Sequence, residues 1–148
     1  MDTEELEAAA RAIVDAGRYM TLGTADADGR PWVSPVWYAH EDARAFLWVS
    51  DPGTRHSFNV AVRQDVSLVI FDSHAELGEG RGLYVRARAD QLDDAAAADA
   101  IAVFSRRSIA QGGHEWSAGD VRAPARLRLY RAVAVERDLG ILDQRHRL

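Results

Sequence analysis

The stretch that decides the fold is residues 19–72, YMTLGTADADGRPWVSPVWYAHEDARAFLWVSDPGTRHSFNVAVRQDVSLVIFD. Residues 19–25 alternate in polarity, which is typical of a strand with one buried face. The Asp-Gly pair of DADGR predicts a hairpin turn before a second strand at 31–40. A third strand is expected at 45–50 after the turn EDAR, and a fourth, buried one at 66–73. Hairpin turns between strands favour antiparallel pairing.

The sequence on either side adds helices and two more strands. The other expected elements are a helix from Asp2 to about Arg18, a short helix that begins near Thr54, a helix at 93–107, and strands at 83–91 and 125–137. Asp2 and Glu5 have the spacing of a capping box. The segment 108–124 is polar and contains glycine, and the tail after 137 has no clear pattern. These elements indicate a single α+β domain over 1–148 with an antiparallel barrel.

Composition excludes several kinds of chemistry. The 148 residues include no cysteine and no lysine, so all 18 basic residues are arginines. Disulfides, thiolate sites and Schiff-base catalysis are therefore excluded. No window approaches the ~20 apolar residues of a membrane span, and the acidic N-terminus is unlike a signal peptide, so a cytoplasmic protein with no membrane partner is expected. A net charge of −5 disfavours nucleic-acid binding, including an OB-type barrel that stacks single strands on aromatic residues.

The start of the short helix carries an unusual set of side chains. Thr54 is a good N-cap, but Arg55 and His56 place cations at the positive end of the helix dipole, at a cost of ~0.3–1 kcal/mol each when no anion is near. A bound anion, most often a phosphate, would offset this cost. The alternative is a simple helix cap with two solvated side chains. The residues alone leave both interpretations open.

One tryptophan lies outside the expected strands. Trp32, Trp37 and Trp48 fall on strands, where core or dimer packing is the ordinary role. Trp116 falls in a loop expected to be mobile, and it is a candidate to cover a ligand. His114 and Glu115 beside Trp116 are candidates for proton transfer, although a solvated loop is the simpler interpretation. The five histidines show no metal-ligand spacing, so no metal site is expected.

Residues 19–72 resemble the FMN-binding split β-barrel of the pyridoxamine 5'-phosphate oxidase-like superfamily. The similarity covers about residues 15–90. It rests on an ordered set: a first strand and Gly turn, the second strand P-x-V-S-P-V, a third strand that ends in Ser, the Thr-Arg-His helix start with Asn, and VSLVIFD. The resemblance implies a six-stranded antiparallel split β-barrel with flanking helices, and a homodimer that binds flavin mononucleotide (FMN) between its subunits.

The resemblance also implies which residues contact the cofactor. Those along the isoalloxazine ring are Val33, Ser34, Pro35 and Val36, and those around the ribityl phosphate are Val49, Ser50, Thr54, Arg55 and His56. Asn59 and Trp116 complete the expected cofactor-binding set. The family usually has lysine at the position of His56, so a neutral histidine weakens the charge there. The alternative for Asn59 is a residue on the helix surface or at a subunit contact.

The implied function is a flavin-dependent oxidoreductase that transfers hydride between FMN and an unidentified small organic substrate. Two alternatives remain open. One is a deazaflavin-dependent reductase, which needs a longer basic groove. The other is a non-enzymatic module that binds or senses flavin or haem. The tail DQRHRL lacks the Arg-Leu-His-Asp-Arg type motif of the true oxidase, so oxidation of pyridoxamine phosphate is not expected.

Overall fold

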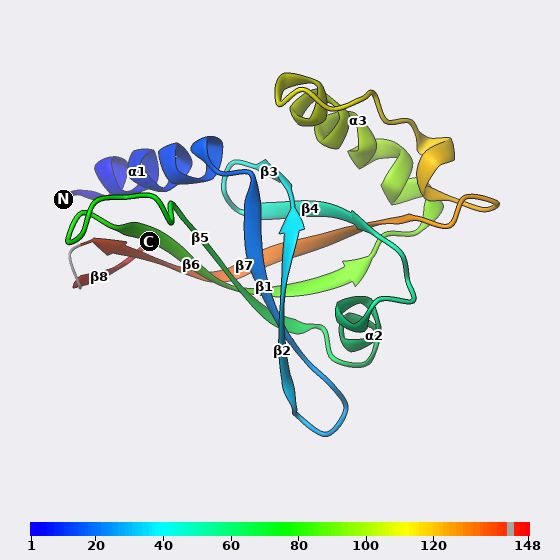
Figure 1. Cartoon of the computed structure of the whole chain (residues 1–148), viewed down its shortest axis with the longest axis horizontal. Coiled ribbons are helices and arrows are strands. Elements are labelled where there is room, and N and C mark those ends of the chain that lie inside the picture. The colour runs from blue at the N-terminus through cyan, green and yellow to red at the C-terminus, as the bar shows by residue number, and fades with distance from the viewer. Residues whose placement is uncertain (142–143) are drawn as a thin grey trace.

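Eight strands form one antiparallel sheet in the computed structural model, which describes residues 1–141 and 144–148 (Figure 1). The strands are β1 (Tyr19–Ala25), β2 (Pro31–Trp37), β3 (Ala39–Glu41), β4 (Ala45–Ser50), β5 (Asp65–Phe71), β6 (Arg81–Gln91), β7 (Arg128–Ile141) and β8 (Gln144–Arg147). Their order is β2-β1-β5-β6-β7-β4-β3, and β8 pairs with β7. The expected α+β fold with an antiparallel split barrel is confirmed.

The sheet curls because a single residue joins its two end strands. β2 pairs with β1, placing Trp37 opposite Tyr19, whereas β3 pairs with β4, placing Ala39 opposite Leu47. Tyr38 alone separates β2 from β3, so the chain crosses from one edge of the sheet to the other within one residue. The edges must therefore lie close together. Tyr38 is fully buried at this crossing. The expected strand at 31–40 is thus two strands, which is one reason why the count is eight rather than six.

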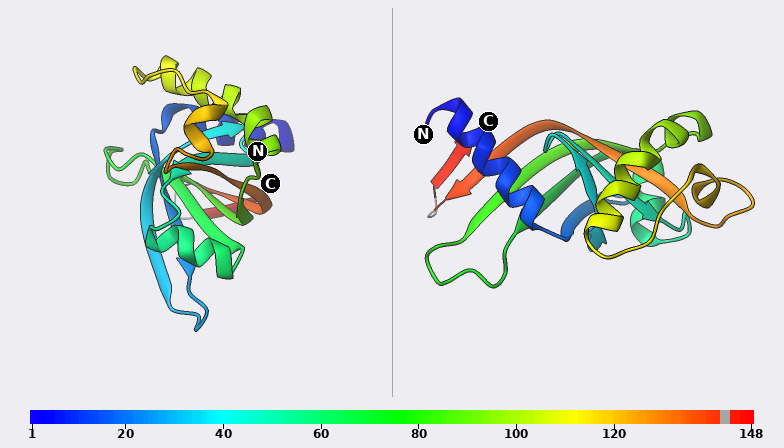
Figure 2. Two further views of the ribbon diagram at one scale, coloured as in Figure 1. Left: turned by 90° about the vertical axis from the view of Figure 1, so that its right-hand side faces the viewer. Right: turned by 90° about the horizontal axis from the view of Figure 1, so that it is seen from above.

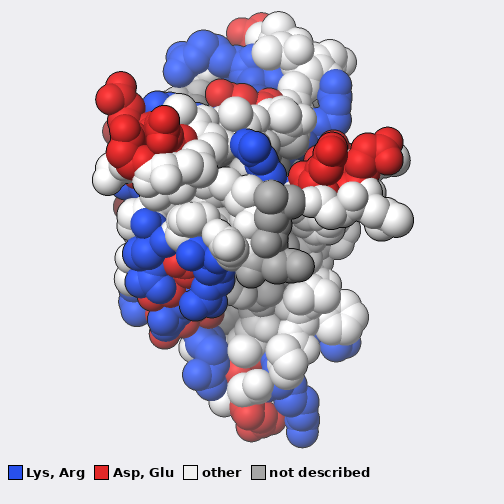
Figure 3. All heavy atoms as spheres, turned by 90° about the vertical axis from the view of Figure 1, so that its left-hand side faces the viewer, with Lys and Arg blue, Asp and Glu red and all other residues white. Residues whose placement is uncertain are grey.

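The second additional strand comes from the tail. β7 runs four residues beyond the expected end at 137, and β8 folds back along it. Arg147 of β8 donates from Nε to Asp138 Oδ1 at 2.6 Å and from Nη2 to Glu136 Oε1 at 3.0 Å. Basic and acidic side chains lie intermixed over this end of the molecule (Figure 3). The tail carries no apolar alternation because these charge pairs, rather than a buried face, fix its position.

In residues 1–141 and 144–148, three α-helices and one short 3₁₀ turn pack on the sheet (Figures 1 and 2). They are α1 (Thr3–Ala16), α2 (Arg55–Val62), α3 (Asp94–Ala110) and η1 (Ala118–Val121). The predicted capping box of α1 is present, because Asp2 and Glu5 exchange side-chain and backbone hydrogen bonds. α1 contacts β5 and β6, α2 contacts β1, β2 and β6, and α3 contacts β3. No helix among the described residues is both long and apolar enough to span a membrane.

Alternation along β4 separates two apolar cores. Trp48 points into the barrel, where its ring stacks on Tyr130 with centroids 5.7 Å apart. Leu47 points the other way and packs under α3 with Phe104. The same strand therefore fills the barrel and holds α3 against its outside. As a result, the end of β4, the start of α2 and the C-terminal end of α3 surround a common space.

Arg107 of α3 caps the C-terminal end of α1, which has no basic residue in its own last turn. Its Nη2 donates to the carbonyl oxygens of Val14 at 2.9 Å and Gly17 at 2.7 Å. Its Nε donates to the carbonyl oxygen of Tyr38 at 3.0 Å. A cation at a helix C-terminus is favoured by the helix dipole. Arg107 therefore ties α1, α3 and the β2–β3 crossing together.

Candidate functional site

The end of β4 and the start of α2 form a cluster of polar side chains. As expected, Thr54 caps α2: its Oγ1 accepts from the Ser57 N–H at 3.4 Å and donates to Ser57 Oγ at 2.7 Å. His56 Nε2 lies 2.9 Å from Ser50 Oγ and 3.2 Å from Thr54 Oγ1. Ser50, Thr54 and His56 therefore converge at the N-terminus of α2. We call these three residues the helix-start cluster.

Burial lowers the pKa of His56 below its ordinary value, because the half-buried ring loses hydration that would favour its charged form. In the chain without a ligand, the imidazole is therefore neutral at pH 7. Both hydroxyl contacts are made to Nε2, and in a neutral ring this nitrogen can accept from the hydroxyl groups while Nδ1 carries the proton.

Because of this lowered pKa, we predict that the wild-type protein loses more stability than His56→Gln at mildly acidic pH. Well above pH 6.5, the ordinary histidine pKa, the imidazole is neutral in the folded and unfolded chains and contributes nothing to the pH dependence. As pH falls below that value, the unfolded chain takes up a proton first, so the free energy of unfolding decreases. In His56→Gln this part of the decrease should be absent. Urea denaturation of both proteins at steps from pH 7 to pH 5 measures the free energy of unfolding. If this free energy depended on pH in the same way in both proteins, the lowered pKa of His56 would be contradicted.

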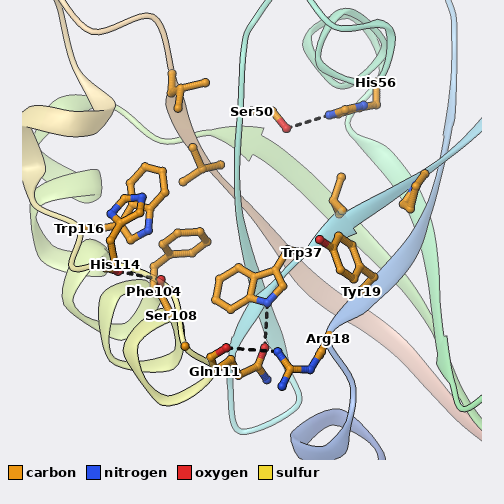
Figure 4. Close-up of a pocket in the computed structure, with 16 residues that line it drawn as sticks. Arg18, Tyr19, Trp37, Ser50, His56, Phe104, Ser108, Gln111, His114 and Trp116 are labelled. Carbon is orange, nitrogen blue, oxygen red and sulfur yellow. Dashed lines mark hydrogen bonds between the residues drawn. The ribbon is translucent and has the colours of Figure 1, made fainter.

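A cleft of about 610 Å³ opens beside the helix-start cluster (Figure 4). Its lining residues are Arg18, Tyr19, Pro35, Val36, Trp37, Val49, Ser50, His56, Phe104, Ser108, Gln111, Gly112, Gly113, His114, Trp116 and Leu127. Six of the predicted cofactor-binding residues are among them: Pro35, Val36, Val49, Ser50, His56 and Trp116. The structure thus brings together residues from β2, β4, α2 and the segment after α3.

The other five predicted residues lie around the cleft rather than in its lining. Val33 is 66% exposed on the outer face of β2, while Ser34 points to the opposite face and is buried. Thr54 adjoins the cleft through its contact with His56.

Arg55 turns toward β2, so that the centre of its guanidinium lies 4.3 Å from the centroid of the Trp32 ring. Within the described residues, no carboxylate lies within ion-pair distance of Arg55. A cation over an indole face is attracted by about 0.5–1 kcal/mol at an exposed site. The arginine is therefore held close to the helix-start cluster by a weak contact, and it is free to take an anionic partner.

Asn59 is buried, so it is not the surface residue of the alternative interpretation. Its Nδ2 donates to Thr24 Oγ1 at 3.0 Å. This bond fastens α2 to β1 beneath the helix-start cluster. A direct contact between Asn59 and a cofactor stays a prediction.

The segment that carries Trp116 is fastened to α3, contrary to the expected mobile loop. The Trp116 N–H donates to Ser105 Oγ at 2.9 Å, and Ser108 Oγ donates to the His114 carbonyl oxygen at 2.7 Å. A Cβ on Gly113 would lie 2.5 Å from Ser108 Oγ, so only glycine allows this close approach. The fixed segment makes one wall of the cleft.

Aromatic rings run along that wall. Trp37 and Phe104 meet edge to face with centroids 5.0 Å apart, and Phe104 and Trp116 do the same at 5.3 Å. The His114 ring stacks on Trp116 at 4.5 Å. Such a wall suits a flat ligand. Trp37 and Phe104 were missed as site residues because an apolar residue on a strand or helix is most often core.

Two polar residues of the site were also not predicted from the sequence. Arg18 follows α1 and Gln111 follows α3, and Arg18 Nη1 donates to the Gln111 carbonyl oxygen at 3.2 Å. Gln111 falls in the polar segment 108–124 of the sequence and was given no role. Nothing local connects it with residue 18, because the contact depends on how α1 and α3 pack.

Comparison with known proteins identifies the family and supports the fold. The sequence profile of a family described as pyridoxamine 5'-phosphate oxidase matches residues 6–136. No curated protein matches the sequence. A structure of HutZ, the haem storage protein from Vibrio cholerae, is similar with a TM-score of 0.71 and 21% identity, covering 94% of this chain and 99% of that chain.

Two further solved structures show the same fold. A Clostridium acetobutylicum protein related to general stress protein 26, of the pyridoxinephosphate oxidase family, has a TM-score of 0.69 and 13% identity, over 100% of this chain and 96% of that chain. A haem-binding protein from Mycobacterium smegmatis has a TM-score of 0.77 and 17% identity; all of this chain matches 58% of that longer chain.

Proposed function

The chain belongs to the pyridoxamine 5'-phosphate oxidase family, and from this premise we propose that it binds FMN and transfers hydride between the flavin and a small organic substrate. The observation that carries the proposal is the helix-start cluster, which opens into a flat-walled cleft at the N-terminus of α2.

The donors at this point fit a phosphate ester. The hydroxyls of Ser50 and Thr54, the imidazole of His56 and the N–H groups of the first turn of α2 are all groups that bind phosphate. Arg55 is one residue from the cap and carries no carboxylate partner among the residues described. In this proposal Arg55 leaves Trp32 to pair with the phosphate, and His56 gains a proton as the phosphate binds.

The second strand fits a flavin ring. β2 is an end strand of the sheet, so alternate backbone N–H and C=O groups of residues 33–36 have no strand partner on its free edge. These groups suit the polar edge of an isoalloxazine, while Pro35 and Trp37 limit the access of water. A bound flavin supplies a ring that accepts or gives up a hydride, and the protein orients it.

An absorbance spectrum of the purified protein tests the proposal. A yellow protein whose released cofactor has the mass of FMN, and which a reduced nicotinamide or dye bleaches, is the expected result. A haem spectrum, as the haem-binding neighbours allow, or the mass of a deazaflavin would replace the cofactor assignment. If the protein binds a flavin that no electron donor reduces, the protein would be a non-enzymatic flavin-binding module. A protein that binds none of these refutes the proposal.

We also propose that the protein is a homodimer. Large apolar side chains lie exposed on the outer face of four adjacent strands: Tyr19, Val33, Phe71 and Tyr84, with the partly buried Val69 among them. Exposed apolar patches of this kind mark association surfaces. Tyr19 also lines the cleft, so a second subunit on this patch would border the flavin.

A charge placed in the patch should separate the subunits. We expect the wild-type protein to sediment as a dimer and Val69→Glu as a monomer that binds FMN more weakly. Val135→Glu is the matched control, because Val135 is 68% exposed on β7 and lies outside the patch. Sedimentation analysis measures both variants. A wild-type monomer, or a Val69→Glu dimer, would exclude this interface.

A further inference from the structure

The end of the cleft opposite the helix-start cluster carries a second cation. Figure 4 shows the Ser50–His56 pair at one end of the pocket and Arg18 beside Gln111 at the other, with aromatic side chains between them. In the described part of the chain, no carboxylate lies within ion-pair distance of Arg18. Its one recorded hydrogen bond goes to a neutral backbone carbonyl. Most of the five N–H donors of this guanidinium therefore remain for a ligand.

The residues next to the Arg18 side chain are held by hydrogen bonds. Trp37 Nε1 donates to Gln111 Oε1 at 2.8 Å, and Gln111 Nε2 donates to the Gly17 carbonyl oxygen at 3.3 Å. These bonds fix Gln111, whose carbonyl oxygen accepts from Arg18. A Cβ on Gly17 would collide with the buried Tyr38 hydroxyl group, so a larger residue here would force the Tyr38 side chain to move. The backbone beside Arg18 and its hydrogen-bond acceptor are thus fixed, whereas the exposed guanidinium itself is steered toward the cleft by one hydrogen bond.

The charge of the cleft differs from that of the whole protein. The chain contains 23 acidic residues and has a net charge of −5, yet none of the residues that line the cleft is Asp or Glu. The lining combines Arg18, two histidines, hydroxyl and amide groups and aromatic rings. A lining that combines an arginine with hydrogen-bond donors and no carboxylate favours anionic ligands.

We propose that Arg18 and Gln111 form a substrate subsite that binds the carboxylate of a flat, aromatic acid. The guanidinium fork matches a carboxylate, and the ring of the acid would lie along Trp37 and Phe104. The inference rests on the proposed flavin site, because the helix-start cluster takes the cofactor phosphate and leaves this end for the substrate.

Benzoate and benzamide form a matched pair of probes, because they have the same ring and similar size but differ in charge. Each probe is titrated into the FMN-loaded protein, and its binding is followed by the change in flavin absorbance. Benzoate should bind at least about tenfold more tightly than benzamide, because it can form a charged hydrogen-bonded pair with Arg18. Arg18→Gln should remove this preference and leave the affinity for FMN within about twofold, since Arg18 does not contact the helix-start cluster. Arg106→Gln is the control, an exposed arginine of α3 outside the cleft lining, and it should keep the preference.

Each other outcome overturns the subsite. Equal binding of the two probes would show that charge is not recognised, and a preference kept in Arg18→Gln would place the anion elsewhere. If Arg18→Gln instead weakens FMN binding or lowers the flavin reduction potential with no change for benzoate, Arg18 serves the cofactor. If the protein binds no FMN, the proposed function fails, but quenching of tryptophan fluorescence by benzoate still tests the subsite in the unloaded protein.

Discussion

An Arg55→Ala variant is expected to bind FMN about 10- to 100-fold more weakly than the wild-type protein, because a hydrogen bond to a charged group contributes about 1.5–3 kcal/mol. Among the residues that the structure describes, the guanidinium over Trp32 has no carboxylate partner to leave, so the weak contact with the indole is what opposes its transfer to a phosphate. Folding should change little, since Arg55 is exposed.

Riboflavin provides the control for this prediction. It carries the same ring and ribityl chain as FMN but no phosphate, so its affinity should stay within about twofold in Arg55→Ala. Flavin fluorescence titrations measure the four dissociation constants, those of FMN and riboflavin for the wild type and for Arg55→Ala. If Arg55→Ala weakened riboflavin and FMN equally, the arginine would act on the ring or on the fold instead of on the phosphate.

Replacing Arg107 by alanine should lower the free energy of unfolding by about 3 kcal/mol, as expected for the loss of three hydrogen bonds from a largely buried cation. The variant leaves the carbonyl groups of Val14, Gly17 and Tyr38 with fewer donors. It also removes the cation from the Tyr38 ring, whose centroid lies 5.0 Å from the guanidinium carbon.

Arg106→Ala is the matched control, because it removes the neighbouring arginine of the same helix from an exposed position. Surface changes of this kind usually stay within about 0.5 kcal/mol. Urea denaturation of the two variants and the wild type gives the comparison. Equal stability of Arg106→Ala and Arg107→Ala would mean that Arg107 does not hold α1 to the barrel.

Local signals allowed much of the fold to be predicted. The capping box of Asp2 and Glu5, the Asp-Gly turn before β2 and the Thr54 cap all depend on residues within a few positions of one another, and each is present. The crossing at Tyr38 was missed because residues 36–39 are a continuous apolar run with no turn residue to separate β2 from β3. Where a strand changes partner depends on the closure of the whole sheet, which no local pattern records.

The candidate site likewise has one part that local sequence predicts and another part that depends on long-range packing. The helix-start cluster lies within seven residues of the chain, so its composition was visible in the sequence. The opposite end of the cleft depends on Arg18 and Gln111, which are 93 residues apart in the sequence and are brought together by long-range hydrogen bonds between the end of α3 and the end of α1. The direction of a side chain is equally hidden: Arg55 turns to Trp32, and Asn59 turns inward to Thr24.

A crystal structure of the protein loaded with FMN tests the central claim most directly. We predict that the phosphate lies within hydrogen-bond distance of Ser50, Thr54 and His56, with Arg55 turned from Trp32 onto it. A phosphate bound at the Arg18 end of the cleft, or a flavin bound outside the cleft, would contradict the account.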